Sequence, residues 1–336
     1  MLTTTDYHTA GEPFRIVTAG VATPRGHTVP ERRHWAMEHL DEVRALLCRE
    51  PRGHADMYGC FPTPPDDDAG DLGTVFFHND GFSTACGHGT IALATWAIET
   101  GLVPVTEGQT ECRVVVDVPS GRVVAIATLA AGRVTSVRFR NVPARVHGLD
   151  VPLEVEVPGG GGRRTLHLDV AYGGAFYATI AATELGYEVV PGDLPALIAW
   201  GRAIQAAANR TLDLRLPDDS GEVGLYGAIF FDDLGPGHQR NVTVFADGQV
   251  DRSPCGSGTS ARLAILAERG VLDVGDELRH DSIVGTRFLG RVLGVVRDAA
   301  GGPAYDTEVE GRAVRTGQHT FVLEPDDELG TGFVLR

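Results

Sequence analysis

Apolar residues recur at two different spacings along the chain, and these spacings predict both helices and strands. Residues 31–49 carry apolar side chains at helical spacing, which predicts one helix on the surface. Residues 194–208 show a similar spacing and predict another amphipathic helix. Residues 90–99 are apolar almost throughout, so we expect this helix to be buried on all its faces.

Shorter apolar segments, separated by Gly and Pro residues, predict strands. Residues 6–20 indicate a turn leading into a strand, and residues 75–77 a short buried strand. Further strands are expected at residues 112–118, 123–129, 134–142, 166–170, 241–245 and 317–324. The Pro- and Asp-rich residues 62–71 predict an exposed loop, and residues 158–162 predict the tip of a hairpin.

One stretch of the sequence occurs twice. The first copy contains Cys86-Gly87-His88-Gly89-Thr90, and the second contains Cys255-Gly256-Ser257-Gly258-Thr259. In both copies a helix is expected to follow the cysteine, and the second of these helices covers residues 259–269. The two cysteines are 169 residues apart, about half of the 336-residue chain. A match at so long a period predicts a duplicated domain rather than a solenoid.

The composition is that of a soluble globular protein, with 43% hydrophobic and 22% charged residues. The length suits two domains, each with its own core. A net charge of −16 disfavours nucleic acid or an anionic membrane as partner, since both require basic patches. No apolar run reaches the ~18 residues of a membrane-spanning helix, and the N-terminus lacks the features of a signal peptide. We therefore expect a cytoplasmic protein.

The numbers and spacing of cysteines and the absence of lysine exclude several kinds of site and catalysis. Five cysteines at irregular spacing argue against a disulfide framework, and no Cys-x-x-Cys pair predicts a zinc site. The sequence contains no lysine, so it cannot hold pyridoxal phosphate as a Schiff base. A lysine nucleophile and the Walker phosphate-binding lysine are excluded for the same reason. We therefore expect no cofactor and no metal.

The two matched cysteines have the chemical setting of a proton-transfer pair. A helix N-terminus lowers the pKa of a thiol from its usual ~8.5, and the glycines allow free backbone N–H groups to hold a carboxylate. A thiolate on one face of an amino acid removes the α-proton and a thiol on the other face returns one, which inverts the α-carbon. His88 and Asp251 lie close to the cysteines in the sequence and are candidates to tune or relay these protons.

At these residues the sequence resembles the proline racemase family. The resemblance is carried by Cys86-Gly87-His88-Gly89, by residues 251–260, by the N-terminal block 6–13 and by block 52–59. It covers nearly the whole chain and implies an α+β, diaminopimelate-epimerase-like fold, with two pseudo-symmetric α/β domains that each wrap a curved sheet around a central helix. It further implies a first domain of residues 1–128 plus about 320–336, a second of residues 129–319, and an active site between them.

The resemblance also implies roles for individual residues. Cys86 and Cys255 would be the acid/base pair, and the substrate carboxylate would bind the backbone of Gly87, His88, Gly256 and Ser257. Tyr58 and Phe245 fall at positions that line the substrate ring. The implied partner is a small molecule, proline or a hydroxyproline, and a homodimer is compatible with the sequence.

The reaction has one main interpretation and several alternatives. Segments 81–86, 169–177 and 244–251 are most similar to the trans-3-hydroxy-L-proline dehydratase branch of the family. Those dehydratases usually keep one of the two cysteines, with Ser or Thr at the other position, whereas this chain has both. We therefore favour a cofactor-independent racemase or 2-epimerase over a dehydratase. A cysteine hydrolase with Cys86 and His88 as a dyad, or an amino-acid-binding protein, gives no reason for two matched cysteines.

Overall fold

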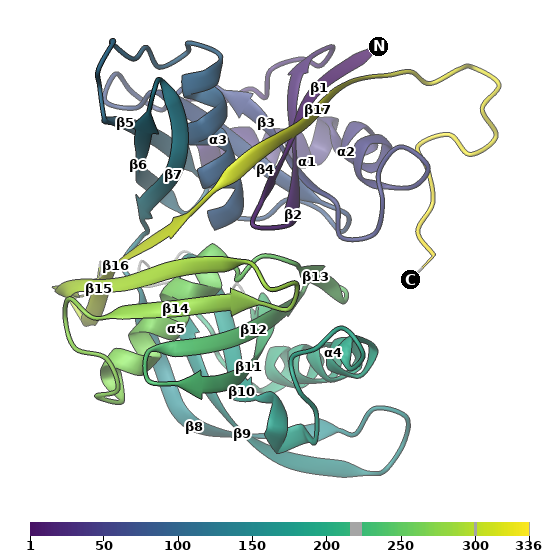
Figure 1. Cartoon of the computed structure of the whole chain (residues 1–336). Helices are drawn as coiled ribbons and strands as arrows, with labels where there is room; N and C mark the ends of the chain where they lie inside the picture. Colours follow the sequence, from purple (N-terminus) through teal and green to yellow (C-terminus); the bar gives the residue numbers. More distant parts are fainter. Residues whose placement is uncertain (216–223, 299–300, 336) are drawn as a thin grey trace. The chain divides into compact units, whose positions relative to one another are not determined.

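The computed structural model describes residues 1–215, 224–298 and 301–335, and the chain divides into two compact units (Figure 1). The first unit contains Met1–Phe139 and Gly311–Arg336, and the second contains Arg140–Glu310. The first unit thus extends to residue 139 rather than 128. It takes in the chain from residue 311 rather than 320, because the last strand pairs along its whole length with the first.

The first unit is a mixed sheet curved around one helix. Its strands have the order β17–β1–β2–β3–β4–β5–β6, with β2/β3 and β4/β5 parallel and the other pairs antiparallel. Helix α3 contacts β1, β2, β5, β6 and β17. The elements are β1 (Leu2–Thr9), β2 (Glu12–Ala19), α1 (Val29–His39), α2 (Asp41–Cys48), β3 (Tyr58–Thr63), β4 (Leu72–His78), α3 (Gly87–Glu99), β5 (Glu111–Val118), β6 (Gly121–Ala130), β7 (Arg133–Arg140) and β17 (Ala313–Phe321).

The second unit has the same kind of sheet around helix α5. Its strands have the order β8–β9–β10–β11–β12–β14–β15–β16, with β10/β11 and β12/β14 parallel. The elements are β8 (Arg145–Glu156), β9 (Arg163–Tyr172), β10 (Phe176–Ala181), the 3₁₀ helix η1 (Ala182–Leu185), α4 (Leu194–Thr211), β11 (Gly227–Gly235), β12 (His238–Phe245), β13 (Gln249–Asp251), α5 (Gly256–Glu268), β14 (Glu277–Ser282), β15 (Arg287–Arg297) and β16 (Pro303–Gly311).

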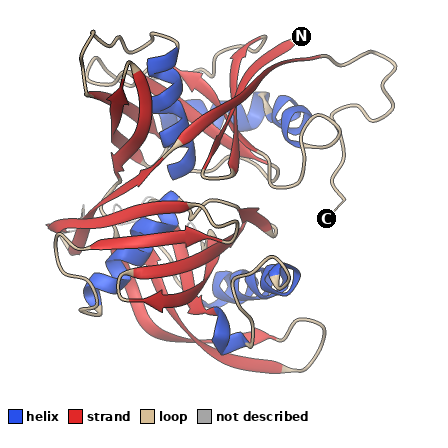
Figure 2. Cartoon of the chain, viewed as in Figure 1, coloured by secondary structure: helices blue, strands red, loops and turns tan. Residues whose placement is uncertain are grey.

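The two units repeat one connectivity, which agrees with the duplication seen in the sequence. In each unit a parallel strand pair is joined through the cysteine-bearing helix, as β4–α3–β5 in the first and β12–α5–β14 in the second. The preceding parallel pair is joined through α1 and α2 in the first unit and through η1 and α4 in the second. Figure 2 shows these helices in blue against the strands in red.

The sequence predicts most elements correctly and misses some. The predicted hairpin tip at residues 158–162 is confirmed, because β8 and β9 pair from Glu156↔Arg163 onward. The predicted helix over residues 31–49 is instead two helices that meet at Leu40, which adopts φ −122°. Strands β1, β8, β10 and β11 were not predicted. In β1 and β8 the buried and exposed positions do not alternate cleanly. Part of the loop expected at residues 62–71 belongs to β3.

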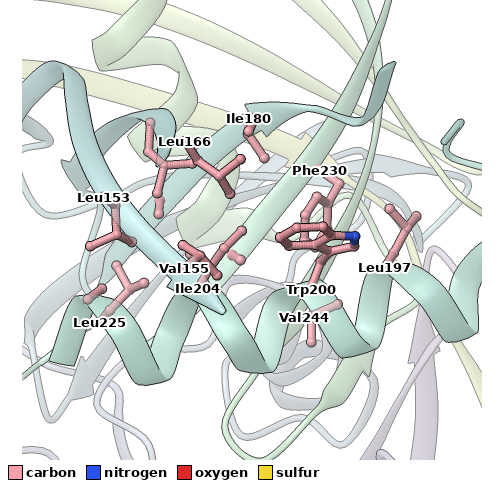
Figure 3. Packing of buried hydrophobic residues seen from close by; sticks show 14 of the residues in the cluster. Leu153, Val155, Leu166, Ile180, Leu197, Trp200, Ile204, Leu225, Phe230 and Val244 are labelled. Carbon is pink, nitrogen blue, oxygen red and sulfur yellow. The ribbon is translucent and has the colours of Figure 1, made fainter. Parts of the chain in front are cut away.

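Helices α3 and α5 are buried on nearly every face, as predicted for the first of them. A helix with apolar residues all round is stable only inside a core. On another face of the second unit, α4 presents an apolar stripe to the sheet, and Trp200 is 5% exposed. Figure 3 shows this packing, which contains Leu153, Val155, Leu166, Ile180, Leu197, Trp200, Ile204, Leu225, Phe230 and Val244.

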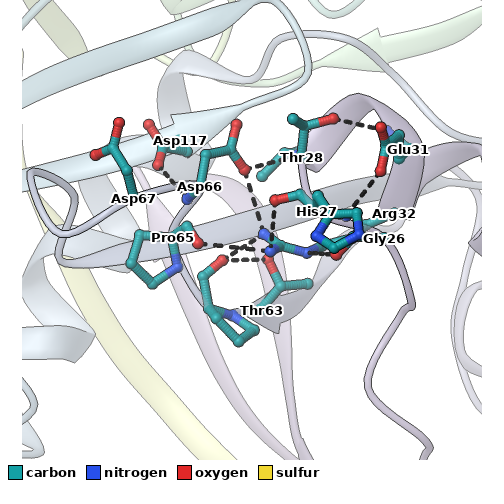
Figure 4. Close-up of polar contacts among 12 residues, drawn as sticks. Gly26, His27, Thr28, Glu31, Arg32, Thr63, Pro65, Asp66, Asp67 and Asp117 are labelled. Atoms are coloured by element: carbon teal, nitrogen blue, oxygen red, sulfur yellow. Dashed lines mark hydrogen bonds and ion pairs between the residues drawn. The ribbon is translucent and has the colours of Figure 1, made fainter.

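The start of α1 is anchored by a buried arginine (Figure 4). Arg32 donates from Nη1 to the Pro64 carbonyl at 2.6 Å and from Nη2 to the His27 carbonyl at 3.0 Å. It also pairs with Asp66 at 3.3 Å, whose Oδ1 accepts the Val29 amide at 2.8 Å. These contacts fix part of the loop between β3 and β4 against the helix, so this loop is ordered around a buried cation.

A second buried pair joins the N-terminal strands. Arg15 on β2 donates from Nη2 to Oδ2 of Asp6 on β1 at 2.8 Å, and both side chains are less than a tenth exposed. Nη1 of Arg15 also donates to the carbonyls of Leu47 at 2.6 Å and Arg52 at 2.9 Å. The guanidinium lies 4.5 Å from the ring centroid of Phe321 on β17. One arginine thus ties β1, α2 and β17 to β2.

No helix among the described residues is long and apolar enough to cross a membrane.

Candidate active site

Cys86 is the residue that caps the N-terminus of α3. Its backbone is extended, with φ −155°, and its Sγ accepts the Gly89 amide at 3.2 Å. The Thr90 amide makes the first helical bond to the Cys86 carbonyl at 3.0 Å, so the Gly87 and His88 amides lie ahead of the helical ladder. The thiol is 6% exposed and stands at the positive end of the helix dipole, which favours its thiolate form.

Gly89 allows the helix to begin this close to the thiol. A Cβ on Gly89 would lie 2.5 Å from the Phe14 ring and 2.7 Å from Cys86 Sγ. The same restriction occurs in the second copy, where a Cβ on Gly258 would lie 2.9 Å from Cys255 Sγ. The second glycine of each Gly-x-Gly turn is therefore required for space beside the sulfur.

His88 lies directly against the Cys86 thiol. Both of its ring nitrogens are 3.5 Å from Sγ, and its own carbonyl accepts the Thr9 hydroxyl at 2.8 Å. Burial lowers the pKa of His88 to about 3, so the imidazole is neutral at pH 7. A neutral imidazole donates from one nitrogen only, so His88 can stabilise the thiolate by hydrogen bonding without contributing a positive charge.

Tyr58 forms one wall around this pair. Its ring lies edge-on to the His88 ring, with centroids 4.9 Å apart, and its hydroxyl bonds the Ser83 hydroxyl. Phe14 contacts the same imidazole at 5.6 Å between centroids. The structure thus brings Tyr58, His88 and Cys86 together, and adds Phe14, which sequence reasoning did not single out.

Cys255 holds the matching position before α5, with a different backbone. It has φ +62° and ψ 104°, a region that non-glycine residues rarely occupy. Such a conformation costs about 1–3 kcal/mol and persists only where neighbouring groups hold it. The Cys255 amide donates to the Ser253 hydroxyl at 3.2 Å, and Asp251 accepts both the amide and the hydroxyl of Ser253, at 2.8 and 2.7 Å.

Tyr177 and Ser257 lie beside the Cys255 thiol. The Tyr177 hydroxyl is 3.7 Å from Sγ and 2.7 Å from the Ser257 hydroxyl, which is itself 4.0 Å from Sγ. Sequence reasoning proposed only the backbone of Ser257 and missed Tyr177. No local signal could have found Tyr177, because it comes from β10, 78 residues before the cysteine.

Phe245 is connected to Tyr177 through the ring of Tyr226. It stacks on Tyr226 at 5.5 Å between centroids, and Tyr226 meets Tyr177 edge-on at 5.8 Å. Phe245 is therefore linked to the Cys255 neighbourhood through two tyrosines. Gly256, the remaining predicted site residue in this unit, is the first residue of α5.

The electrostatic environment favours the protonated form of Cys255. Burial, followed by the negative charge of Asp251, raises the pKa of the thiol to about 12, although the Gly258 amide, Tyr177 and Thr243 act in the opposite direction. Burial also raises the pKa of Asp251 to about 6, against hydrogen bonds from Ser253 and from the cysteine side chain. At pH 7 the two buried groups therefore form a thiol next to a carboxylate.

This arrangement predicts the effect of Asp251→Asn on thiol reactivity. Removing the carboxylate charge lowers the pKa of the Cys255 thiol, so we expect alkylation by iodoacetamide to become several-fold faster near pH 8. Below about pH 6, where Asp251 is itself protonated, the two proteins should converge. The rate is measured on tryptic peptide 253–262, which carries Cys255 between two arginine cleavage sites. An unchanged rate at pH 8 would contradict the electrostatic role of Asp251.

Metal binding finds no support in the part of the chain that the structure describes, where no group of three or more His, Cys, Asp and Glu side chains could hold an ion.

The chain is similar to known proteins over its full length. The Proline racemase family model matches residues 4–334. The chain is 45% identical over 337 residues to the trans-3-hydroxy-L-proline dehydratase of Bacillus cereus (99% of this chain, 98% of that protein). It is 42% identical over 337 residues to the 3-hydroxyproline 2-epimerase of Burkholderia multivorans (100% and 98%).

A solved structure has the same fold. The crystal structure of a hydroxyproline epimerase from Agrobacterium vitis, with bound trans-4-OH-L-proline, superposes with a TM-score of 0.89 at 32% identity, covering 99% of this chain and 95% of that one. The expected diaminopimelate-epimerase-like, α+β fold is thereby confirmed. The match of the family model over residues 4–334 shows that the chain is an enzyme and belongs to the proline racemase family.

Proposed function

We propose that the protein is a cofactor-independent 2-epimerase or racemase that acts on a hydroxyproline or on proline through Cys86 and Cys255. The observation that carries the proposal is the presence of a cysteine at the start of both duplicated helices, α3 and α5. An enzyme that inverts an α-carbon needs a base on one face and an acid on the other. Two matched thiols supply both.

In the proposed reaction one proton leaves the α-carbon and another arrives. The Cys86 thiolate takes the α-proton, the electron pair of the C–H bond moves into the carboxylate, and the Cys255 thiol gives its proton to the opposite face. The raised pKa of Cys255 supports its starting as the acid, whereas the Gly89 amide and His88 stabilise the thiolate of Cys86. The enantiomeric substrate requires the opposite roles.

The first turns of the two helices provide a binding site for the carboxylate. We propose that the amides of Gly87, His88, Gly256 and Ser257 bind it, since first-turn amides lack helical partners and lie at the positive end of the dipole. A carboxylate held in this way accepts the negative charge that develops when the α-proton leaves. Tyr58 and Phe245 are proposed as walls for the ring.

A dehydratase is the second candidate, because one of the cited relatives carries that name. Of the two relatives cited, one is named a trans-3-hydroxy-L-proline dehydratase and the other a 3-hydroxyproline 2-epimerase. In the lyase reaction the base removes the α-proton, a C2=C3 double bond forms, and the 3-hydroxyl leaves as water after protonation. Because both names share 3-hydroxyproline, trans-3-hydroxy-L-proline is the first substrate to test.

One NMR experiment separates the two reactions. The protein is incubated in deuterated water with trans-3-hydroxy-L-proline, trans-4-hydroxy-L-proline or L-proline. We expect the α-proton signal to decrease as deuterium enters, together with new signals of the C2 epimer when the substrate is a hydroxyproline. D-Proline has the same spectrum as L-proline, so inversion of proline is measured by chiral chromatography of the same sample. Loss of the C3 hydroxyl and formation of a cyclic imine would instead establish the dehydratase. Absence of α-exchange and of elimination with all three compounds would overturn both candidates.

A further inference from the structure

The peptide bond between Pro254 and Cys255 is held by side chains at both ends. Its oxygen, on Pro254, accepts Asn241 Nδ2 at 2.8 Å and Thr259 Oγ1 at 3.1 Å. Its N–H, on Cys255, donates to Ser253 Oγ at 3.2 Å. The orientation of this peptide sets the φ angle of Cys255, which is +62°. The side chains that hold the peptide therefore determine the direction in which the thiol points.

The side chains on the carbonyl side of this peptide are buried and come from two strands and one helix. Asn241 lies on β12 and Thr259 on α5, and both are fully buried. Behind them, His280 on β14 places Nδ1 2.9 Å from the Thr259 hydroxyl and is also fully buried. Burial lowers the pKa of His280 to about 3, so it is a neutral ring at pH 7.

The hydrogen-bond directions follow from these contacts. The Thr259 hydroxyl has one proton, which it donates to the Pro254 carbonyl. His280 must then donate from Nδ1 to Thr259 Oγ1, a tautomer assigned from the network. In that tautomer Nε2 is an acceptor, and it has no hydrogen-bond partner among the described residues. The histidine thus fixes the threonine rotamer at the cost of leaving one ring nitrogen unpaired.

The first copy of the motif uses its threonine differently. Thr90 matches Thr259, but its hydroxyl donates at 2.9 Å to the carbonyl of Cys86, which already accepts the Thr90 amide at 3.0 Å. That bond lies within the helix and does not reach the preceding peptide. Cys86 correspondingly has an ordinary extended backbone. Of the two copies, only the one in which the threonine bonds the carbonyl before the cysteine has a cysteine with positive φ.

We infer that Asn241 and Thr259, with His280 behind Thr259, are positioning residues that hold the Cys255 thiol in its working direction. The inference rests on the role proposed above for Cys255 as a proton donor and acceptor. Asn241 and Thr259 donate to the Pro254 carbonyl, and His280 contacts the Thr259 hydroxyl. Each acts through the Pro254–Cys255 peptide, which would otherwise relax toward a negative φ and move the sulfur.

The test uses Thr259→Val, which keeps the shape of the side chain and removes both hydrogen bonds. A displacement of about 1 Å at a reacting group can cost about 10²-fold in rate, so we expect kcat for epimerisation to fall by about that factor while KM changes little. Thr259→Ser restores the hydroxyl and should recover most of the rate. Asn241→Leu, which removes the other donor to Pro254, should behave as Thr259→Val does.

Thr95→Val is the matched control. Thr95 is a buried threonine on α3 whose hydroxyl donates to the Ile91 carbonyl of its own helix at 2.9 Å. It undergoes the same chemical change without contact to either cysteine turn, so kcat should stay within about twofold of the parent rate. Thermal unfolding of every variant shows whether a loss of rate reflects a loss of folded protein.

A second measurement of the Cys255 environment does not depend on the substrate. Iodoacetamide labelling of peptide 253–262 reports on Cys255 without turnover. We expect faster labelling in Thr259→Val than in the parent or in Thr259→Ser, because a released peptide exposes the sulfur. Parent-like kcat and labelling in Thr259→Val would overturn the inference. A parent protein that turns over no substrate, with labelling still dependent on Thr259, would overturn the proposed function alone.

Discussion

Replacement of Cys255 by serine is expected to reduce epimerisation by about 10²–10⁴-fold, the usual contribution of a general acid or base. A serine hydroxyl has nearly the shape of the thiol but a far higher pKa, so it cannot exchange protons with the α-carbon at useful rates. The measurement is the appearance of inverted product from the L-substrate in deuterated water. The backbone at residue 255 should tolerate serine, since only the sulfur changes.

The cysteine variants together separate the two candidate reactions. If the protein is an epimerase, Cys86→Ser and Cys255→Ser should both lose inversion. If it is a dehydratase, Cys86→Ser should lose elimination, whereas Cys255→Ser should keep much of it, because elimination needs no proton on the opposite face. Cys112→Ser, at a buried cysteine on β5, is the control for serine substitution and should retain full activity. Inversion at the parent rate in Cys255→Ser would rule out the two-cysteine mechanism.

Arg15→Met should lower the free energy of unfolding of the first unit by about 3–5 kcal/mol, the usual effect of removing one partner of a buried ion pair. The substitution keeps much of the apolar side chain but leaves Asp6 buried without its guanidinium, and it frees the carbonyls of Leu47 and Arg52. Urea unfolding followed by circular dichroism measures the change.

Two further variants test the origin of this loss. Asp6→Asn in the Arg15→Met background should recover part of the stability, because the side chain at position 6 is then neutral and no longer a buried charge without its guanidinium. Arg163→Met removes an arginine from exposed pairs with Glu154 and Glu156 and should change stability by no more than about 1 kcal/mol. An Arg15→Met protein as stable as Arg163→Met would show that the buried pair contributes little.

The duplicated motif allowed the sequence to predict the two buried helices and the position of both cysteines at their starts. The start of a helix is determined by residues close in the sequence, so the Gly-x-Gly-Thr segment after each cysteine was sufficient to locate both helix starts. The division of the expected helix at Leu40 was not visible, because apolar spacing continues across the break. Strand β8 was missed because only two of its twelve residues are buried, and exposed and buried positions do not alternate in its first part.

The surroundings of the cysteines could be predicted only in part. His88 and Asp251 are close to the cysteines in sequence and were identified as candidates. Tyr177, Asn241 and His280 reach the second turn from other strands, and their positions depend on sheet register rather than on any local pattern. The positive φ of Cys255 was equally hidden, since no glycine marks it.

The pairing of β17 with β1 has a consequence for synthesis of the chain on the ribosome. The second unit is one continuous segment, so all of its strands are available once residue 310 has left the exit tunnel. The first unit begins earlier but cannot place β17 beside β1 until residues 313–321 have emerged. Domains of many proteins fold in order from the N-terminus. Here the second unit can complete its fold before the first. Until β17 emerges, the edge of β1 that pairs with it stays without its hydrogen-bond partner.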